Sequence, residues 1–104
     1  MENLIHIINC YGEGVYVVES GDTLSSIAEK FSTTENLIAI ENNINSEVNI
    51  GDKLYIKMHK TIYTVTPMDT LKSIATKFNV SEDRLLYENK ISYVYVGERI
   101  VIPN

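Results

Sequence analysis

The feature of this 104-residue chain that most constrains its fold is an internal repeat. Residues 16–57 align with residues 63–103 at an offset of about 47 positions, and roughly half of the residues in the gap-free part, 16–44 against 63–91, are identical. The alignment has one single-residue gap, which lies in the second copy before Gly97, the counterpart of Gly51. The chain therefore contains two copies of one small unit, and a unit of this size buries only a modest fraction of its surface.

Each copy opens with signals for a strand and then a helix. Residues 16–18 and 63–65 combine β-branched and aromatic side chains, which favour short strands. Apolar side chains then recur at the i, i+3, i+4, i+7 spacing of one helical face. They are Leu24, Ile27, Ala28 and Phe31 in the first copy, and Leu71, Ile74, Ala75 and Phe78 in the second. Before these helices, the pairs Asp22-Thr23 and Asp69-Thr70 supply side-chain oxygens suited to capping them.

Each copy closes with a second helix and a second strand. Thr34 and Ser81 are good N-caps, and the helices that they begin are expected to end around Asn42 and Asn89. The predicted closing strands are residues 53–56 and 99–102. The predicted fold class is therefore α+β. It consists of two tandem strand–helix–helix–strand modules, each with a two-stranded antiparallel sheet packed on two helices.

The residues outside the repeats predict an extension and a connector. The predicted boundaries are an N-terminal strand and hairpin extension over residues 1–15, a first module over 16–57, a linker over 58–62 and a second module over 63–104. The apolar run from Leu4 to Asn9 predicts an extra strand, and residues 11–14 predict the turn that follows it. This strand either adds an edge to the first sheet, or pairs with a protein partner or a second copy of the chain as a homodimer.

Charge and composition exclude several classes of function. A net charge of −5, with scattered basic residues, argues against nucleic acid and against an anionic membrane surface as partners. The single cysteine, Cys10, excludes an intramolecular disulfide, and we expect it to be a small hydrophobic side chain on or beside a strand. Neither a signal peptide nor a transmembrane segment is visible, which predicts synthesis in the cytoplasm.

The sequence offers no catalytic constellation. Asp22 and Glu41 recur at equivalent places as Asp69 and Glu88, which indicates the architecture of a module and not one catalytic pair. The two histidines lie far apart and are not duplicated, so no metal-ligand spacing is present. We therefore expect no enzyme, no catalytic residue, no metal site and no cofactor.

Both copies resemble the LysM family, whose pattern runs Y-x-V-x-x-G-D-T-L-x-x-I-A, then a hydrophobic–x₃–Asn segment, then a Gly and a closing strand. The first copy matches this pattern at Tyr16, Val18, Gly21, Asp22, Thr23, Leu24, Ile27, Ala28, Asn42, Gly51, Leu54 and Ile56. The second copy matches it at Tyr63, Val65, Asp69, Thr70, Leu71, Ile74, Ala75, Asn89, Gly97, Ile100, Ile102 and Pro103, and departs from it at Met68, where the family has Gly. The resemblance implies a bacterial βααβ module that binds peptidoglycan or chitin-type oligosaccharides.

The resemblance also implies a place for the glycan, a shallow groove between the loop after the first strand and the loop after the second helix. In the first copy these positions are Gly21, Asp22, Thr23, Leu24, Asn43, Ile44, Asn45, Val48, Asn49 and Ile50. In the second copy they are Asp69, Thr70, Leu71, Ile91, Ser92, Tyr93 and Tyr95. Loop amides beside apolar side chains suit N-acetyl groups and sugar rings, and the two tyrosines offer a stacking surface.

Many of these residues also have a purely structural interpretation. The alternatives are helix caps for the Asp-Thr pairs, core positions for Leu24 and Leu71, strand packing for Tyr95, and backbone hydrogen bonds for Asn42 and Asn89.

We expect a non-catalytic carbohydrate-binding protein that recognises N-acetylglucosamine-containing glycan in peptidoglycan, spore cortex or chitin-type oligosaccharides, at the cell wall or spore of a bacterium. The alternative is a structural or assembly protein, of the spore-coat or phage tail or baseplate kind, that uses the same fold for protein contacts. Saturable binding to chitooligosaccharides distinguishes the two hypotheses.

Overall fold

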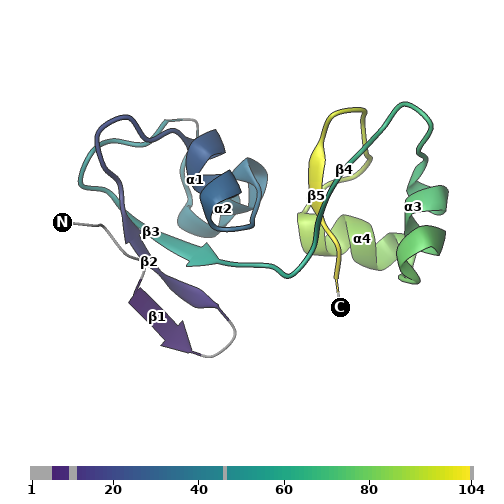
Figure 1. The fold of residues 1–104 in the computed structure, drawn as a ribbon, viewed down its shortest axis with the longest axis horizontal. Coiled ribbons are helices and arrows are strands. Elements are labelled where there is room, and N and C mark those ends of the chain that lie inside the picture. The colour runs from purple at the N-terminus through teal and green to yellow at the C-terminus, as the bar shows by residue number, and fades with distance from the viewer. Residues whose placement is uncertain (1–5, 10–11, 46, 104) are drawn as a thin grey trace. The chain divides into compact units, whose positions relative to one another are not determined.

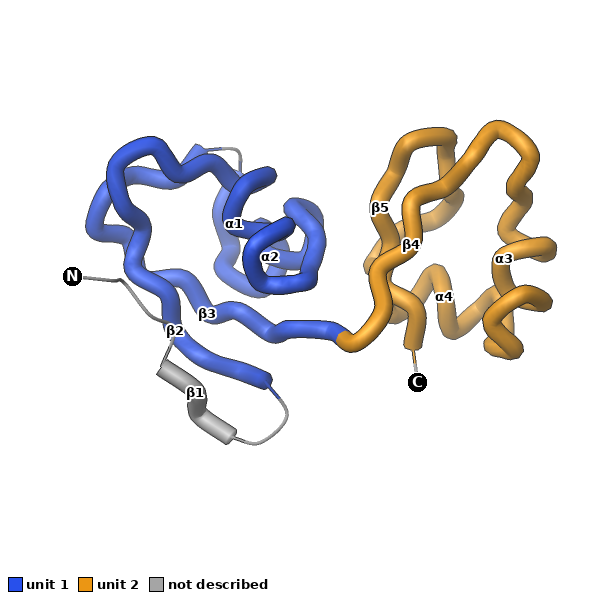
Figure 2. Tube along the Cα trace, in the orientation of Figure 1, with its two compact units in different colours: residues 1–59 blue, residues 60–104 orange. Residues whose placement is uncertain are grey.

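The computed structural model describes residues 6–9, 12–45 and 47–103, with only the backbone for residues 6–9. The expectations for Leu4, Ile5, Cys10 and Tyr11 therefore lie outside the described residues. The chain forms two compact units, residues 1–59 and residues 60–104 (Figure 2). Each unit has its own sheet and its own core.

An antiparallel three-stranded sheet forms one layer of the first unit (Figure 1). Its strands are β1 (His6–Asn9), β2 (Glu13–Val17) and β3 (Lys53–Lys57), in the order β1-β2-β3. The prediction of an extra N-terminal strand is confirmed, and β1 lies at an edge of this sheet. Strand β2 begins three residues earlier than predicted, because residues 13–15 pair with both β1 and β3. The predicted turn over residues 11–14 is therefore wrong at Glu13 and Gly14, which belong to the strand.

Two helices pack on this sheet: α1 (Leu24–Lys30) and α2 (Glu35–Asn42). Thr23 and Thr34 cap them as predicted, since each side-chain oxygen accepts the backbone N–H three residues further on. Apolar side chains of the helices and strands meet in one core. Its buried members are Tyr16, Val18, Leu24, Ile27, Ala28, Ile38, Leu54 and Ile56. The predicted helical face therefore points inward.

The second unit repeats this layout. Its elements are β4 (Ile62–Thr64), α3 (Leu71–Phe78), α4 (Glu82–Asn89) and β5 (Arg99–Val101), and β4 pairs with β5 in an antiparallel two-stranded sheet (Figure 1). Its separate core consists of Val65, Ile74, Ala75, Leu85, Ile100 and Ile102. The predicted α+β class, with one βααβ arrangement per copy, is confirmed. Within the described ranges, no helix has the length and apolar character needed to cross a membrane.

One asparagine in each unit joins the end of the second helix to the closing strand. The Asn89 amide donates to the carbonyls of Leu85 and Val101, both at 2.8 Å, and its oxygen accepts the Val101 N–H at 2.6 Å. Asn42 makes the same three bonds with Ile38 and Tyr55. Both side chains therefore satisfy backbone groups, which confirms the structural interpretation given to them.

Candidate functional site

In each unit, backbone hydrogen bonds hold the bases of the two predicted site loops together. The Val18 N–H donates to the Asp52 carbonyl at 2.9 Å, and the Gly51 N–H donates to the Val18 carbonyl at 2.8 Å. The second unit has the same pair of bonds around Val65. Gly51 and Gly97 have φ values of 94° and 89°, in the left-handed region that glycine adopts without strain. The backbone thus fixes where the first loop starts and where the second loop ends.

Asp22 lies in the first of these loops and closes it. The prediction that Asp22 takes part in capping α1 is wrong, because Thr23 is the cap. Asp22 Oδ2 instead accepts two hydrogen bonds, from Tyr16 Oη at 2.6 Å and from the Glu19 N–H at 2.8 Å. The carboxylate therefore spans its own loop and joins it to a tyrosine that is 0% exposed.

Asp69 makes the equivalent contacts in the second unit, where Thr70 is the cap. Its Oδ2 accepts from Tyr63 Oη at 2.6 Å and from the Thr66 N–H at 2.8 Å. The Thr66 hydroxyl adds a third bond at 2.9 Å. We call the two Tyr–Asp hydrogen bonds, Tyr16–Asp22 and Tyr63–Asp69, the latches.

The latches change the pKa values of the tyrosine and aspartate residues that form them. Partial burial acts to raise the pKa of Asp22, but the hydrogen bonds from Tyr16 and Glu19 outweigh it, so the pKa lies below its ordinary value. The Tyr63 hydrogen bond is the main reason why the pKa of Asp69 is lowered. Burial, followed by the hydrogen bond to Asp22, raises the pKa of Tyr16. Each aspartate is therefore charged at neutral pH.

The turn before each aspartate has a different backbone in the two units. The Asp22 N–H donates to the Glu19 carbonyl across a four-residue turn whose third residue, Gly21, has φ 89°. That value is typical of a type II turn. Met68 holds this place in the second unit, has no left-handed φ, and is 88% exposed. The second turn thus closes with a backbone conformation that residues other than glycine can adopt.

A hollow of about 190 Å³ lies where the two predicted loops of the first unit meet. Its lining residues are Asp22, Thr23, Leu24, Ser25, Glu35, Glu47 and Val48. Four of these residues were predicted from the family resemblance: Asp22, Thr23, Leu24 and Val48. Ser25, Glu35 and Glu47 were not predicted. Ser25 and Glu35 could have been predicted from the sequence, because they lie in the first turns of the helices α1 and α2.

The other predicted residues of the first unit do not line this hollow. Ile44 packs against the core, and Asn43 ends α2 with a left-handed φ of 55°. Gly21, Asn45, Asn49 and Ile50 are exposed. Leu24 is both a core residue and a lining residue, so its core position is confirmed and its glycan contact stays a prediction.

In the second unit the corresponding loops expose aromatic side chains. Tyr93 is 69% exposed and Tyr95 57% exposed, and their ring centroids lie 6.3 Å apart at an interplanar angle of 50°. The alternative of strand packing for Tyr95 is wrong, because Tyr95 lies in the loop before β5. Leu71 and Ile91 pack against the core, and Ser92 is exposed. These loops thus offer a more aromatic surface than those of the first unit.

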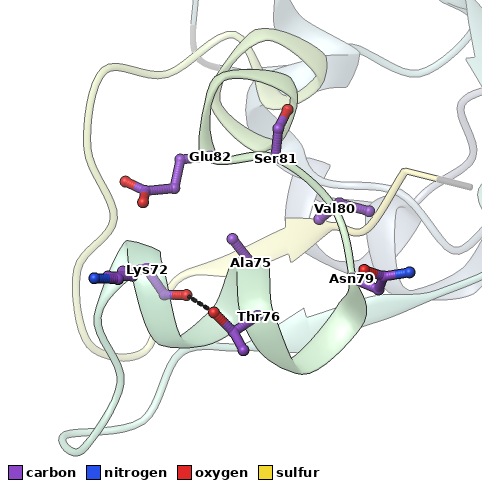
Figure 3. Close-up of a pocket in the computed structure, with 7 residues that line it drawn as sticks. All are labelled: Lys72, Ala75, Thr76, Asn79, Val80, Ser81 and Glu82. Carbon is purple, nitrogen blue, oxygen red and sulfur yellow. Dashed lines mark hydrogen bonds between the residues drawn. The ribbon is translucent and has the colours of Figure 1, made fainter.

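A separate hollow of about 510 Å³ lies between α3 and the start of α4 (Figure 3). Its lining residues are Lys72, Ala75, Thr76, Asn79, Val80, Ser81 and Glu82, and none of them is a predicted site residue. Figure 3 shows the Thr76 hydroxyl turned back to the Lys72 carbonyl, to which it donates at 2.9 Å. In the part of the chain that the structure describes, no three His, Cys, Asp or Glu side chains are grouped to hold a metal ion.

The family model for the LysM domain matches residues 16–57 and residues 63–103. The chain belongs to the LysM family. The prediction of two tandem LysM repeats is therefore confirmed. Both latches and the hollow of the first unit lie within the matched segments.

Proteins similar to parts of this chain include a relative from Bacillus subtilis (strain 168), the cell wall-binding protein YocH. It is 43% identical over 49 residues, which are 46% of this chain and 17% of YocH. The solved structure of the spore cortex-lytic enzyme SleL from Bacillus cereus matches 89% of this chain and 23% of that chain, at 28% identity and a TM-score of 0.45. SleL from Bacillus megaterium QM B1551 matches 86% and 22%, at 31% identity and a TM-score of 0.46. This chain thus spans less than a quarter of the length of each of these proteins.

Proposed function

We propose that this chain is a non-catalytic glycan-binding protein whose LysM modules bind N-acetylglucosamine-containing polysaccharide, with peptidoglycan of a bacterial cell wall as the natural ligand. The observation that carries the proposal is the hollow of the first module, where both loops expected to hold glycan meet. Its lining places apolar Leu24 and Val48 beside the polar Thr23 and Ser25. A pyranose ring presents the same combination of apolar C–H faces and polar edges.

The charge of the hollow favours an uncharged ligand. Asp22, Glu35 and Glu47 contribute carboxylates, and its described lining includes no Lys or Arg. A polyanion would be repelled there, whereas N-acetylglucosamine carries no charge. The similarity to YocH, a cell wall-binding protein, supports the cell wall as the place of action.

The duplicated acids support a binding function without catalysis. Asp22 and Asp69 are both held by a tyrosine and by a backbone N–H, in the same arrangement in each module. A general acid or base must instead reach a reacting atom of the substrate. Two weak sites on one chain also gain avidity on a polymer, through effective concentration, when both reach the same strand or mesh.

The test is an NMR titration of the isotope-labelled full chain with N-acetylglucosamine oligomers of increasing length, and then with muropeptide fragments. We expect backbone amide shifts at residues 22–25 and 47–48 that saturate and grow with oligomer length. Glucose oligomers of the same lengths, which lack N-acetyl groups, are the matched control and should produce much smaller shifts. If millimolar ligand of every kind leaves all amides unmoved, the glycan hypothesis is wrong and the assembly alternative is favoured.

A further inference from the structure

The latch of the first module connects the core to the wall of the proposed glycan groove. Tyr16 is 0% exposed, and its ring lies 4.9 Å from that of Phe31, measured between centroids. Its hydroxyl reaches out of the core to Asp22, and Lys30 Nζ donates to the same hydroxyl at 3.3 Å. A rigid, fully packed ring therefore carries the donor that fixes the loop.

The residues that follow Asp22 line the hollow directly. Thr23 and Leu24 are adjacent to it in the chain, and both belong to the lining. One oxygen of Asp22, Oδ2, accepts both hydrogen bonds that close the loop. The carboxylate therefore fixes the turn that leads directly into the part of the groove built by the start of α1.

We propose that Tyr16 and Asp22 are positioning residues of the first glycan groove, and that Asp22 acts by holding the loop and not by contacting the sugar with its charge. This inference rests on the proposed function. It changes the role that the family resemblance implied for Asp22, from ligand contact to loop closure. The presence of the same bonds in the second module, from Tyr63 and Thr66 to Asp69, supports the assignment.

Two isosteric substitutions separate the roles. Asp22→Asn keeps one side-chain oxygen that can accept both loop bonds, but replaces the other oxygen with a donor and removes the charge. Tyr16→Phe removes the latch donor and leaves the carboxylate intact. Tyr63→Phe is the matched control, because Asp69 also accepts from the Thr66 hydroxyl and that bond remains.

The affinity experiment uses the full chain and N-acetylglucosamine oligomers, with amide shifts that report each module separately. Tyr16→Phe should weaken binding at the first module by about five- to tenfold, the amount expected for losing one net hydrogen bond, while the second module keeps its affinity. Asp22→Asn should stay within about threefold of the parent chain, whereas Asp22→Ala should lose about tenfold or more. Tyr63→Phe should have a smaller effect on its own module than Tyr16→Phe has on the first. An Asp22→Asn loss as large as that of Asp22→Ala, or an unchanged affinity in Tyr16→Phe, would overturn the proposal.

Amide hydrogen exchange without ligand provides a second measurement that does not depend on glycan binding. Tyr16→Phe should accelerate exchange at Glu19 and Asp22, whose N–H groups donate within the latched turn, and leave the core amides of α1 unchanged. Unchanged exchange at Glu19 and Asp22 would overturn the claim that the latch fixes the loop. If the parent chain binds no glycan, the proposed function fails, and the exchange result still decides whether the latch holds the loop.

Discussion

Thr33 and Val80 occupy equivalent positions, directly before the caps of α2 and α4, and differ only by a hydroxyl in place of a methyl group. Thr33 is 0% exposed, and its Oγ1 has no hydrogen-bond partner among the described residues. A buried hydroxyl without a partner has lost its bonds to water and gained none in return. The second module avoids this cost with the isosteric valine.

Replacing Thr33 with valine should therefore stabilise the first module. Thr33→Val should raise its free energy of unfolding by about 1 kcal/mol, because it removes an unsatisfied polar group without changing the shape of the site. Urea unfolding followed by NMR signals of each module measures the change. The reciprocal Val80→Thr should destabilise the second module by a smaller amount, since Val80 is only half-buried. A loss of stability in Thr33→Val would show that the hydroxyl has a partner after all.

Tyr55 makes the first module sensitive to alkaline pH. Burial, and then its hydrogen bond to Glu13, raises the pKa of Tyr55 to about 12. The folded-state pKa thus lies above the unfolded value of about 10. The stability that Tyr55 contributes is therefore fully present below about pH 10 and is lost as the pH rises through about 12.

The second module has Val101 in place of Tyr55, so it provides the control within the same chain. Between pH 10 and pH 12, the first module should lose more stability than the second, as measured by urea unfolding at each pH. Tyr55→Phe should reduce this difference. An equal alkaline loss in both modules would contradict the prediction.

At the scale of elements, each module ends its two helices with a residue in the left-handed region. In the first module these residues are Ser32 and Asn43, with φ values of 57° and 55°, and in the second they are Asn79 and Lys90, with 55° and 56°. Asparagine tolerates this conformation better than serine or lysine does. Each module thus has one favourable and one unfavourable helix end, at opposite positions.

Placing asparagine at the unfavourable helix end of each module should improve both modules. Ser32→Asn should raise the unfolding free energy of the first module by about 0.5 kcal/mol, and Lys90→Asn should raise that of the second module. The gain should be smaller for Lys90→Asn, because that change also removes the contact of Lys90 Nζ with the exposed Tyr87 ring at 5.0 Å. Asn79→Ser and Asn43→Lys are the matched reverse variants and should destabilise. Thermal unfolding monitored by module-specific NMR signals checks the four signs.

The order of elements followed from the sequence because local signals agree with the fold in both copies. The helical faces, the Thr and Ser caps and the glycines of the closing turns are all short-range features. The latches were missed because a tyrosine and an aspartate six residues apart have no periodic signal. They meet only when the strand ends and the chain turns back. The lining of the hollow was predicted only in part. Glu47 was missed because it reaches the hollow from a loop whose course no local pattern specifies.

At the scale of the whole molecule, the repeat produces two separate cores. Every member of the core around Ile27 belongs to residues 1–59, and every member of the core around Ile74 belongs to residues 60–104. Among the described residues the two cores share no member, so each module has an apolar core of its own. Each module is small, so its stability rests on few buried side chains.

We therefore predict that the two modules unfold independently. Ile27 and Ile74 are equivalent residues, both 0% exposed, and each truncation to alanine should cost its own module about 2–4 kcal/mol. In Ile27→Ala, hydrogen exchange and urea unfolding of the second module should stay at parent values, and Ile74→Ala should show the converse. Each variant is thus the control for the other. If either substitution destabilises both modules equally, the chain folds as one cooperative unit and the argument from separate cores is wrong.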